Sequence, residues 1–168
     1  MFSVNDHIFY STTGVCRITG IKREKFGNID EQDYYILQPI YSKSITYVST
    51  TNETQLAKMR PVMTRDEIYS LINNMPNEEN IWLQNIHDRN DVFSEKLRTG
   101  NSNELVKLIK TLFLEGNKKR GKGKTLNIND IKILTTAEKL LHEEIAFVLG
   151  IEPDRVLAFI LENVPVQG

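Results

Sequence analysis

Hydrophobic and polar residues alternate along residues 1–60 of the chain. The alternation is clearest in Asp6–Tyr10 and Cys16–Lys22, while β-branched and aromatic residues are dense in Tyr34–Leu37 and Ile45–Ser49. A period of two is typical of strands that bury one face. Turn-forming residues separate these stretches, so the pattern predicts about four or five short strands in a small, strongly curved antiparallel barrel. Such a barrel leaves strand edges open to pairing with another chain.

From about Met63 onward the hydrophobic residues recur with the period of an α-helix. Thr64, with Glu67 three residues later, forms a capping-box signature that opens a helix over Arg65–Met75. Capping residues, glycines and prolines predict four more helices, which run from Asn77–Asn80 to Gly100, from Ser102 to about Lys118, over Ile128–Leu149 and from Pro153 to Asn163. We therefore expect an α+β chain with a β domain over residues 1–62 and an all-helical domain over residues 63–168.

The helical period also predicts which residues of the later helices face a core. These are Leu105, Leu108, Ile109, Leu112 and Phe113, then Ile131, Leu134, Leu141, Ile145 and Val148, and finally Val156, Phe159 and Ile160.

The stretch from Asn80 to Gly100 contains the only tryptophan, Trp82. Ile86, Phe93 and Leu97 fall on one stripe of the expected helix, and Trp82 lies four residues before Ile86, at the N-terminal end of that stripe. A tryptophan in this position can close a core. It can also present a large, stiff, amphipathic ring to a partner. The position alone favours the core, so the charges that follow it matter.

Composition is that of an ordinary soluble protein. The 168 residues are 40% hydrophobic and 26% charged, which is typical of globular domains. A single cysteine, Cys16, excludes an internal disulfide and suits a reducing compartment. No apolar run is long enough to cross a membrane, and the first residues do not resemble a signal peptide. We therefore expect a cytoplasmic protein without membrane association.

The net charge of −1 hides a strongly uneven distribution. Residues 64–95 contain two basic and seven acidic residues, whereas residues 96–124 contain nine basic and two acidic ones. The basic window ends in the glycine-rich segment 117–125, NKKRGKGKT, which is expected to be mobile. A localised positive field of this kind attracts a polyanion such as nucleic acid. A solvated helix face followed by a flexible loop is the equally weighted alternative.

Enzyme signatures are missing from the sequence. It contains no GxGxxG, GxxxxGK[ST], HExxH or GxSxG motif. His7, His87 and His142 lie on separate predicted elements, which argues against a shared metal site. Cys16 lies in a strand pattern and is expected to be a packed thiol, and adjacent glutamates such as Glu143 and Glu144 point in different directions on a helix. We predict no catalytic residue, no metal and no cofactor.

Several segments, taken in order, resemble the CarD-like family of bacterial transcription regulators, whose first domain also occurs in the transcription–repair coupling factor. The matching segments are VNDHIFYSTTGVCRITGI, DYYILQP, ITYVST, MRPVMTRDE, the Trp82 region, ELVKLIKTLFL and AEKLLHEEIAFVLGI. Together they span nearly the whole chain, and their order and spacing carry the resemblance. The later helical segments look most like the branch found in Gram-positive, low-GC bacteria.

The resemblance implies a non-enzymatic partner of RNA polymerase. A Tudor-like barrel would add its edge to the polymerase β subunit, and the helical domain would lie on promoter DNA with a tryptophan as a wedge at the minor groove. The resemblance implies a polymerase contact, and strand position alone places Lys22, Ile45 and Tyr47 as the residues expected to make it. For DNA binding, the resemblance points to Trp82 and Arg89. The basic window adds Lys96, Arg98, Lys118, Lys119, Arg120, Lys122 and Lys124.

Two hypotheses follow. The first is a transcription regulator that binds the polymerase β subunit and promoter DNA, largely independently of sequence, and stabilises the open promoter complex. The second is a protein–protein adaptor that does not bind DNA and packs Trp82 in its helical core. We favour the first and expect a monomer.

Overall fold

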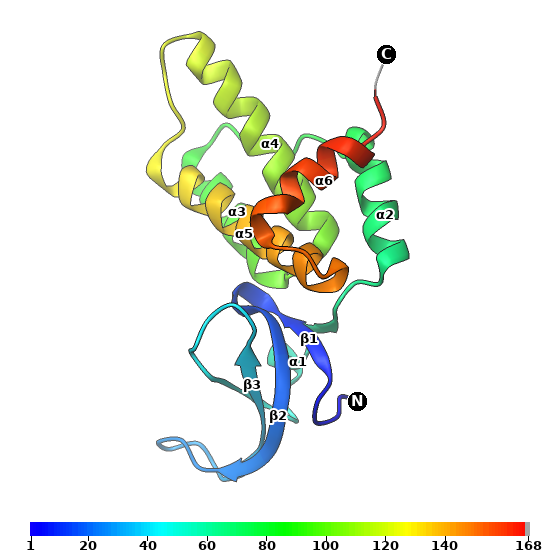
Figure 1. Ribbon diagram of the computed structural model, residues 1–168. Helices are drawn as coiled ribbons and strands as arrows, with labels where there is room; N and C mark the ends of the chain where they lie inside the picture. Colours follow the sequence, from blue (N-terminus) through cyan, green and yellow to red (C-terminus); the bar gives the residue numbers. More distant parts are fainter. Residues whose placement is uncertain (167–168) are drawn as a thin grey trace. The chain divides into compact units, whose positions relative to one another are not determined.

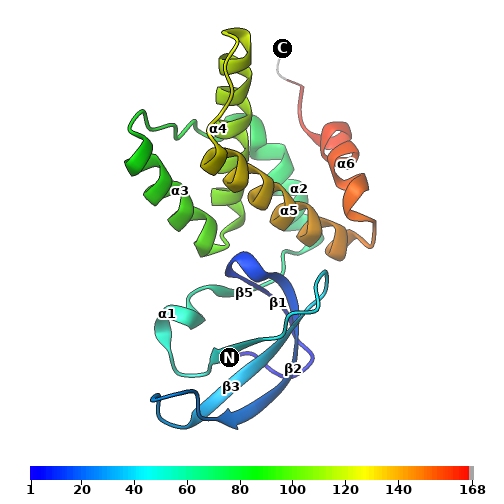
Figure 2. The same ribbon diagram turned by 90° about the vertical axis from the view of Figure 1, so that its left-hand side faces the viewer.

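A computed structural model describes residues 1–166 of the chain. The chain folds into two compact units, one over Met1–Val62 and the other from Met63 onward. The first is built on a β-sheet and the second on α-helices, which Figures 1 and 2 show in two views. None of the helices in the described residues is long and apolar enough to cross a membrane.

The first unit contains an antiparallel sheet with two short helical turns. Its elements are β1 (His7–Tyr10), η1 (Ser11–Thr13), β2 (Gly14–Glu24), β3 (Gln32–Pro39), β4 (Thr46–Ser49), α1 (Glu53–Leu56) and β5 (Met59–Pro61). The strand order is β4-β3-β2-β1-β5. The four strands expected from the alternating pattern are confirmed, whereas α1 and β5 lie in a segment that the pattern did not resolve.

The expected barrel is an open sheet. Strands β4 and β5 form its two edges, and no pairing between them closes it within the described residues. The alternation places one set of side chains on a common face, where Ile18, Leu37 and Val48 are fully buried together with Cys16. Leu56 of α1 packs against this cluster, so the short helix covers part of the core that a closed barrel would enclose.

Within residues 63–166 the second unit contains five α-helices and two short 3₁₀ turns. They are α2 (Arg65–Asn74), η2 (Met75–Asn77), α3 (Ile86–Thr99), α4 (Ser102–Gly121), α5 (Ile128–Leu149), η3 (Pro153–Arg155) and α6 (Val156–Asn163). The capping box of Thr64 and Glu67 is present, and Gly100 and Gly150 end their helices in the left-handed conformation. The predicted bounds of α5 are confirmed.

Helix α4 packs against both α3 and α5, and α5 also contacts α2 and α6. Leu105, Leu108 and Leu112 of α4 are fully buried, as their spacing predicted. The prediction was wrong for Phe113 and Ile131, which are 55% and 46% exposed. On α5 the buried stripe is shifted, because Asp130 and Ile133 turn inward in place of Ile131.

Two boundaries differ from the prediction in ways that affect the site. Helix α3 begins at Ile86, because the Asn85 side chain accepts a hydrogen bond from the Asp88 N–H and caps the helix there. Trp82 therefore lies in the segment before the helix, and Ile86 is 57% exposed. Helix α4 continues to Gly121, so the first part of the glycine-rich segment, expected to be a mobile loop, is helical.

Candidate nucleic-acid interface

Trp82 lies in the irregular segment that joins η2 to α3. Its side chain is half-buried. The edge of the fully buried Phe93 ring faces it, with ring centroids 6.5 Å apart and an interplanar angle of 63°. The guanidinium carbon of Arg89 lies 4.0 Å from the centre of the indole ring. The tryptophan is therefore packed on one side and accessible on another.

The Arg89 guanidinium is buried and fully engaged. Its Nε donates to Oδ1 of Asp130 at 3.1 Å and its Nη2 donates to Oδ2 at 2.9 Å. The two side chains are only 5% and 3% exposed. The third nitrogen, Nη1, donates to the Leu83 carbonyl at 2.8 Å. Arg89 thus joins α3, α5 and the tryptophan segment. A buried, bidentate guanidinium is not available to DNA phosphates, so we correct the expectation that Arg89 contacts DNA directly.

The tryptophan segment is also attached to α4. The Ile81 N–H donates to Oγ1 of the buried Thr111 at 3.0 Å, and the Asn80 amide donates to a Glu115 carboxylate oxygen at 3.4 Å. The backbone N–H of Trp82 donates to Oδ1 of Asn80 at 2.9 Å. Backbone and side-chain hydrogen bonds therefore fix a segment without secondary structure of its own.

Lys110 secures the beginning of the same segment. Its ammonium group donates to the backbone carbonyls of Met75, Pro76 and Glu78 at 3.2, 2.8 and 2.7 Å. These carbonyls belong to the turn η2 and the residue after it, beyond the end of α2. Lys110 is not among the residues of α4 predicted to face the core, and from its position its ammonium reaches these three carbonyls.

Five basic residues at and after the end of α4 form what we name the basic arm: Lys118, Lys119, Arg120, Lys122 and Lys124. In both views the C-terminal end of α4 projects beyond the other helices of its unit (Figures 1 and 2). Cations at this end are favoured by the helix dipole. The Lys119 ammonium lies 5.7 Å from the centre of the Trp82 ring. The fold therefore brings together two predicted parts of the site that are distant in sequence.

Lys96 and Arg98 lie near the other end of α3. Lys96 is seven residues beyond Arg89, about 10 Å along the helix axis. Its ammonium is 2.8 Å from a Glu104 carboxylate oxygen, and Arg98 is 2.9 Å from Glu95. The structure does not gather these two residues with Trp82. In addition, the carboxylates of Asp88 and Asp91 are exposed on the same helix, so a polyanion meets a more positive field at the basic arm.

The three residues expected to bind polymerase lie on the first unit. Tyr47 is on the edge strand β4, and Ile45, which precedes this strand, is 54% exposed. Lys22 is on β2 and its ammonium is 2.8 Å from a Glu24 carboxylate oxygen. That hydrogen bond and the charge of Glu24 raise the Lys22 pKa, so this side chain keeps its positive charge.

Sequence reasoning missed the aromatic neighbours of Tyr47. The Phe26 ring packs edge-on against Tyr34 and Tyr47, with centroids 4.9 and 5.4 Å apart. Phe26 is 41% exposed and Tyr47 is 39% exposed. Phe26 comes from the turn between β2 and β3, whose composition is typical of a polar loop. Exposed aromatic rings therefore lie next to the edge strand β4.

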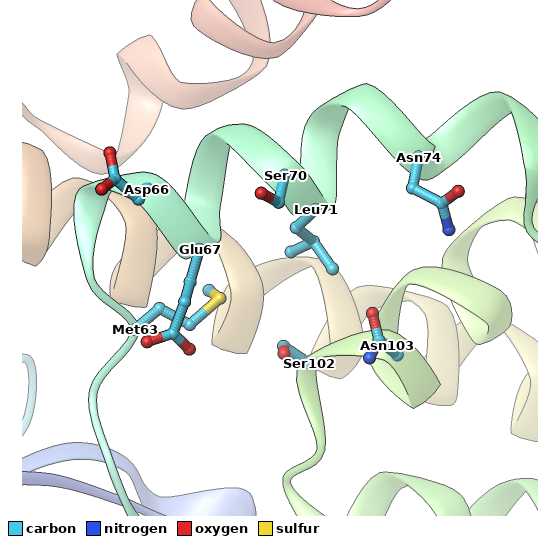
Figure 3. A pocket seen from close by; sticks show the side chains of 8 residues that line it. All are labelled: Met63, Asp66, Glu67, Ser70, Leu71, Asn74, Ser102 and Asn103. Carbon is cyan, nitrogen blue, oxygen red and sulfur yellow. The ribbon is translucent and has the colours of Figure 1, made fainter.

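A depression of about 340 Å³ lies between α2 and the start of α4 (Figure 3). Its lining includes Asp66, Ser70, Asn74 and Ser102, and one Glu67 carboxylate oxygen accepts from the Thr64 N–H in the capping box. No group of three or more His, Cys, Asp and Glu side chains in residues 1–166 is placed to hold a metal ion.

Two protein-family models match the sequence of this chain. The CarD-like/TRCF RID domain matches residues 2–63, and the CarD, C-terminal domain matches residues 67–161. These are the domains of a transcription-regulator class that joins a Tudor-like β unit to a helical unit. The chain belongs to the CarD-like family, whose members are non-enzymatic transcription factors. A comparison with curated proteins finds no match.

Proposed function

We propose that this protein binds the RNA polymerase β subunit through its first unit and promoter DNA through its second, and that Trp82 stabilises the opened promoter. The proposal deepens the family assignment, which indicates a transcription-related protein that interacts with polymerase. The observation that carries it is the half-buried Trp82 ring, which lies against the Arg89 guanidinium and near Lys119 of the basic arm.

The chemistry of the two parts is complementary. An apolar ring inserted at a base step costs unstacking energy but stabilises deformed DNA. Lysine and arginine side chains contribute phosphate contacts that position the protein without reading sequence. A protein that makes the ring contact only with opened DNA shifts the equilibrium from the closed to the open complex. Stabilisation of this kind favours promoters that open poorly.

The first unit supports the polymerase contact by its edge. Strand β4 has a neighbour on one side only, so its other side presents backbone groups to which a partner strand can be added. The exposed rings of Phe26 and Tyr47 lie beside that edge. Aromatic residues of this kind are frequent anchors of protein interfaces.

The adaptor hypothesis assigns Trp82 to the helical core. Its contact with the buried Phe93 favours that interpretation, whereas its half-buried state and the nearby Lys119 favour a surface role. A fully buried aromatic would cost roughly 3–5 kcal/mol on truncation to alanine. We expect Trp82→Ala to cost less, with its main effect on DNA.

The proposal is tested by separating the two contacts. Purified bacterial RNA polymerase is mixed with wild type, Tyr47→Asp or Trp82→Ala, and co-elution is measured with and without a promoter fragment. We expect Tyr47→Asp to lose polymerase and Trp82→Ala to keep it. Thr12→Asp, in the turn before β2, is the matched control for an added charge. If wild type itself does not co-elute with polymerase, the proposed function is wrong.

A further inference from the structure

The buried ion pair beneath Trp82 has no obvious value as a source of stability. Burying a guanidinium and a carboxylate costs desolvation energy that their attraction barely offsets, and apolar residues of similar volume often do as well. Arg89 and Asp130 are nevertheless almost completely buried and share three hydrogen bonds, two from Nε and one from Nη2. The other contacts of Arg89, with the Trp82 segment, suggest what the buried pair does.

Arg89 contacts both the backbone and the Trp82 side chain of the tryptophan segment. Its Nη1 binds the Leu83 carbonyl at 2.8 Å, which fixes the backbone next to Trp82. Its guanidinium group lies against the indole ring, with the carbon 4.0 Å from the ring centre. The buried Arg89 covers the ring, Phe93 packs against it, and Trp82 is nevertheless only half-buried, so part of the ring stays accessible. Asp130 holds the guanidinium through a bidentate pair, which fixes its orientation as a single bond would not.

We propose that Asp130 is a positioning residue for DNA recognition: through Arg89 it holds the Trp82 ring in the orientation that contacts opened DNA. This inference rests on the proposed function. It assigns to Asp130, which touches no DNA, a share in the stabilisation of the open complex. The physical reason is preorganisation, because a ring that is already fixed loses less conformational freedom on binding.

The test replaces both charges at once. Arg89→Met combined with Asp130→Leu removes the pair without leaving an unpaired buried charge, so the fold has the best chance of being kept. Asp130→Asn is the second variant, which keeps the shape and removes the carboxylate charge. Glu143→Gln is the control, since it changes another carboxylate of α5 about 20 Å along the helix. Melting temperatures identify the variants that fold, and either folded variant is sufficient for the test.

Two measurements are made on the folded variants. Trp82 is the only tryptophan, so its fluorescence and its quenching by acrylamide report directly on the ring. We expect stronger quenching in both variants and no change in the control. The lifetime of an open promoter complex should fall by about twofold or more, the lower limit for residues coupled by contact.

A double-mutant cycle with Trp82→Ala separates positioning from general weakening. If Asp130 acts through the ring, adding Trp82→Ala to the charge-free pair shortens the lifetime no further than Trp82→Ala alone. A folded variant with wild-type lifetime would overturn the inference while leaving the proposed function intact. If Trp82→Ala itself leaves the lifetime unchanged, both are overturned.

Discussion

The guanidinium of Arg89 lies 4.0 Å from the centre of the Trp82 ring, inside the helical unit. A cation over an aromatic face is worth about 0.5–2 kcal/mol, the larger value applying when the pair is desolvated. Here the same cation also binds Asp130 and the backbone of the tryptophan segment. One side chain therefore joins the core of the unit to the ring that we assign to DNA.

Asp130→Ala should destabilise the helical unit strongly. The substitution leaves the Arg89 charge buried without its carboxylate, which typically costs about 3–5 kcal/mol. Urea unfolding, followed by circular dichroism, measures the loss. Lys139→Ala is the control, because it removes only a long ion pair, 4.0 Å, between the exposed Lys139 ammonium and Glu143 on the same helix. A loss below about 1 kcal/mol in Asp130→Ala would show that the pair is solvated in solution.

Neutralising the basic arm should lower the salt dependence of DNA binding. The slope of log K against log salt falls by about 0.9 for every duplex phosphate that the protein no longer neutralises. Lys122→Gln and Lys124→Gln together are expected to reduce the slope, measured by fluorescence anisotropy of a labelled fragment. Lys96→Gln, whose ammonium is already paired with Glu104, should reduce it less. A larger reduction in slope for Lys96→Gln than for the arm variant would mean that DNA binds near Lys96, at the C-terminal end of α3, and not at the basic arm.

Lys110→Met should loosen the segment that carries Trp82. Three carbonyls lose their shared donor, while the methionine fills a similar volume. Hydrogen bonds to a charged group contribute about 1.5–3 kcal/mol, and we expect a loss of free energy of unfolding in that range. Trp82 fluorescence should also become easier to quench. Lys107→Met is the matched control, since its ammonium pairs with the carboxylates of Glu79 and Glu104, at 3.5 and 3.9 Å. Equal stability of wild type and Lys110→Met would mean that water replaces the ammonium without cost.

Cys16 should react with thiol reagents only when the first unit opens. Burial raises the thiol pKa from 9.0 to about 12, so at pH 8 the native side chain is protonated and unreactive. The raised pKa of Cys16 also makes stability depend on pH, because the unfolded thiol ionises more easily than the buried one. Its contribution to the free energy of unfolding is complete below pH 9 and declines as the pH rises from 9 towards 12. The rate of reaction with a chromogenic disulfide, with Cys16→Ser as the blank, measures this. A fast reaction of folded protein at pH 8 would contradict the burial.

The fold was largely predictable because its signals are local. Period-two alternation predicted the strands, and capping signals such as the box of Thr64 and Glu67 predicted helix starts. The open sheet was not predictable, since β5 has three residues and no pattern of its own. The start of α3 was misplaced because the segment around Trp82 forms its hydrogen bonds with α4 instead of within a helix of its own.

The contacts of the candidate site residues could not be predicted from the sequence. The family resemblance placed Arg89 with the DNA-binding residues. It could not reveal that Asp130, 41 positions away in sequence, pairs with Arg89 and buries it. The contact between Trp82 and Lys119 also depends on how α4 packs. Phe26 was missed because a single aromatic residue in a polar turn has no periodicity to reveal it.

The most direct test of the account compares wild type, Trp82→Phe and Trp82→Ala in the lifetime of an open complex between RNA polymerase and a promoter that opens poorly. All three proteins are first shown to be folded and to bind polymerase. We predict that wild type prolongs the lifetime, that Trp82→Phe keeps part of the effect and that Trp82→Ala loses it. Equal lifetimes with wild type and Trp82→Ala would contradict the account and favour the adaptor hypothesis, in which Trp82 only packs in the helical core.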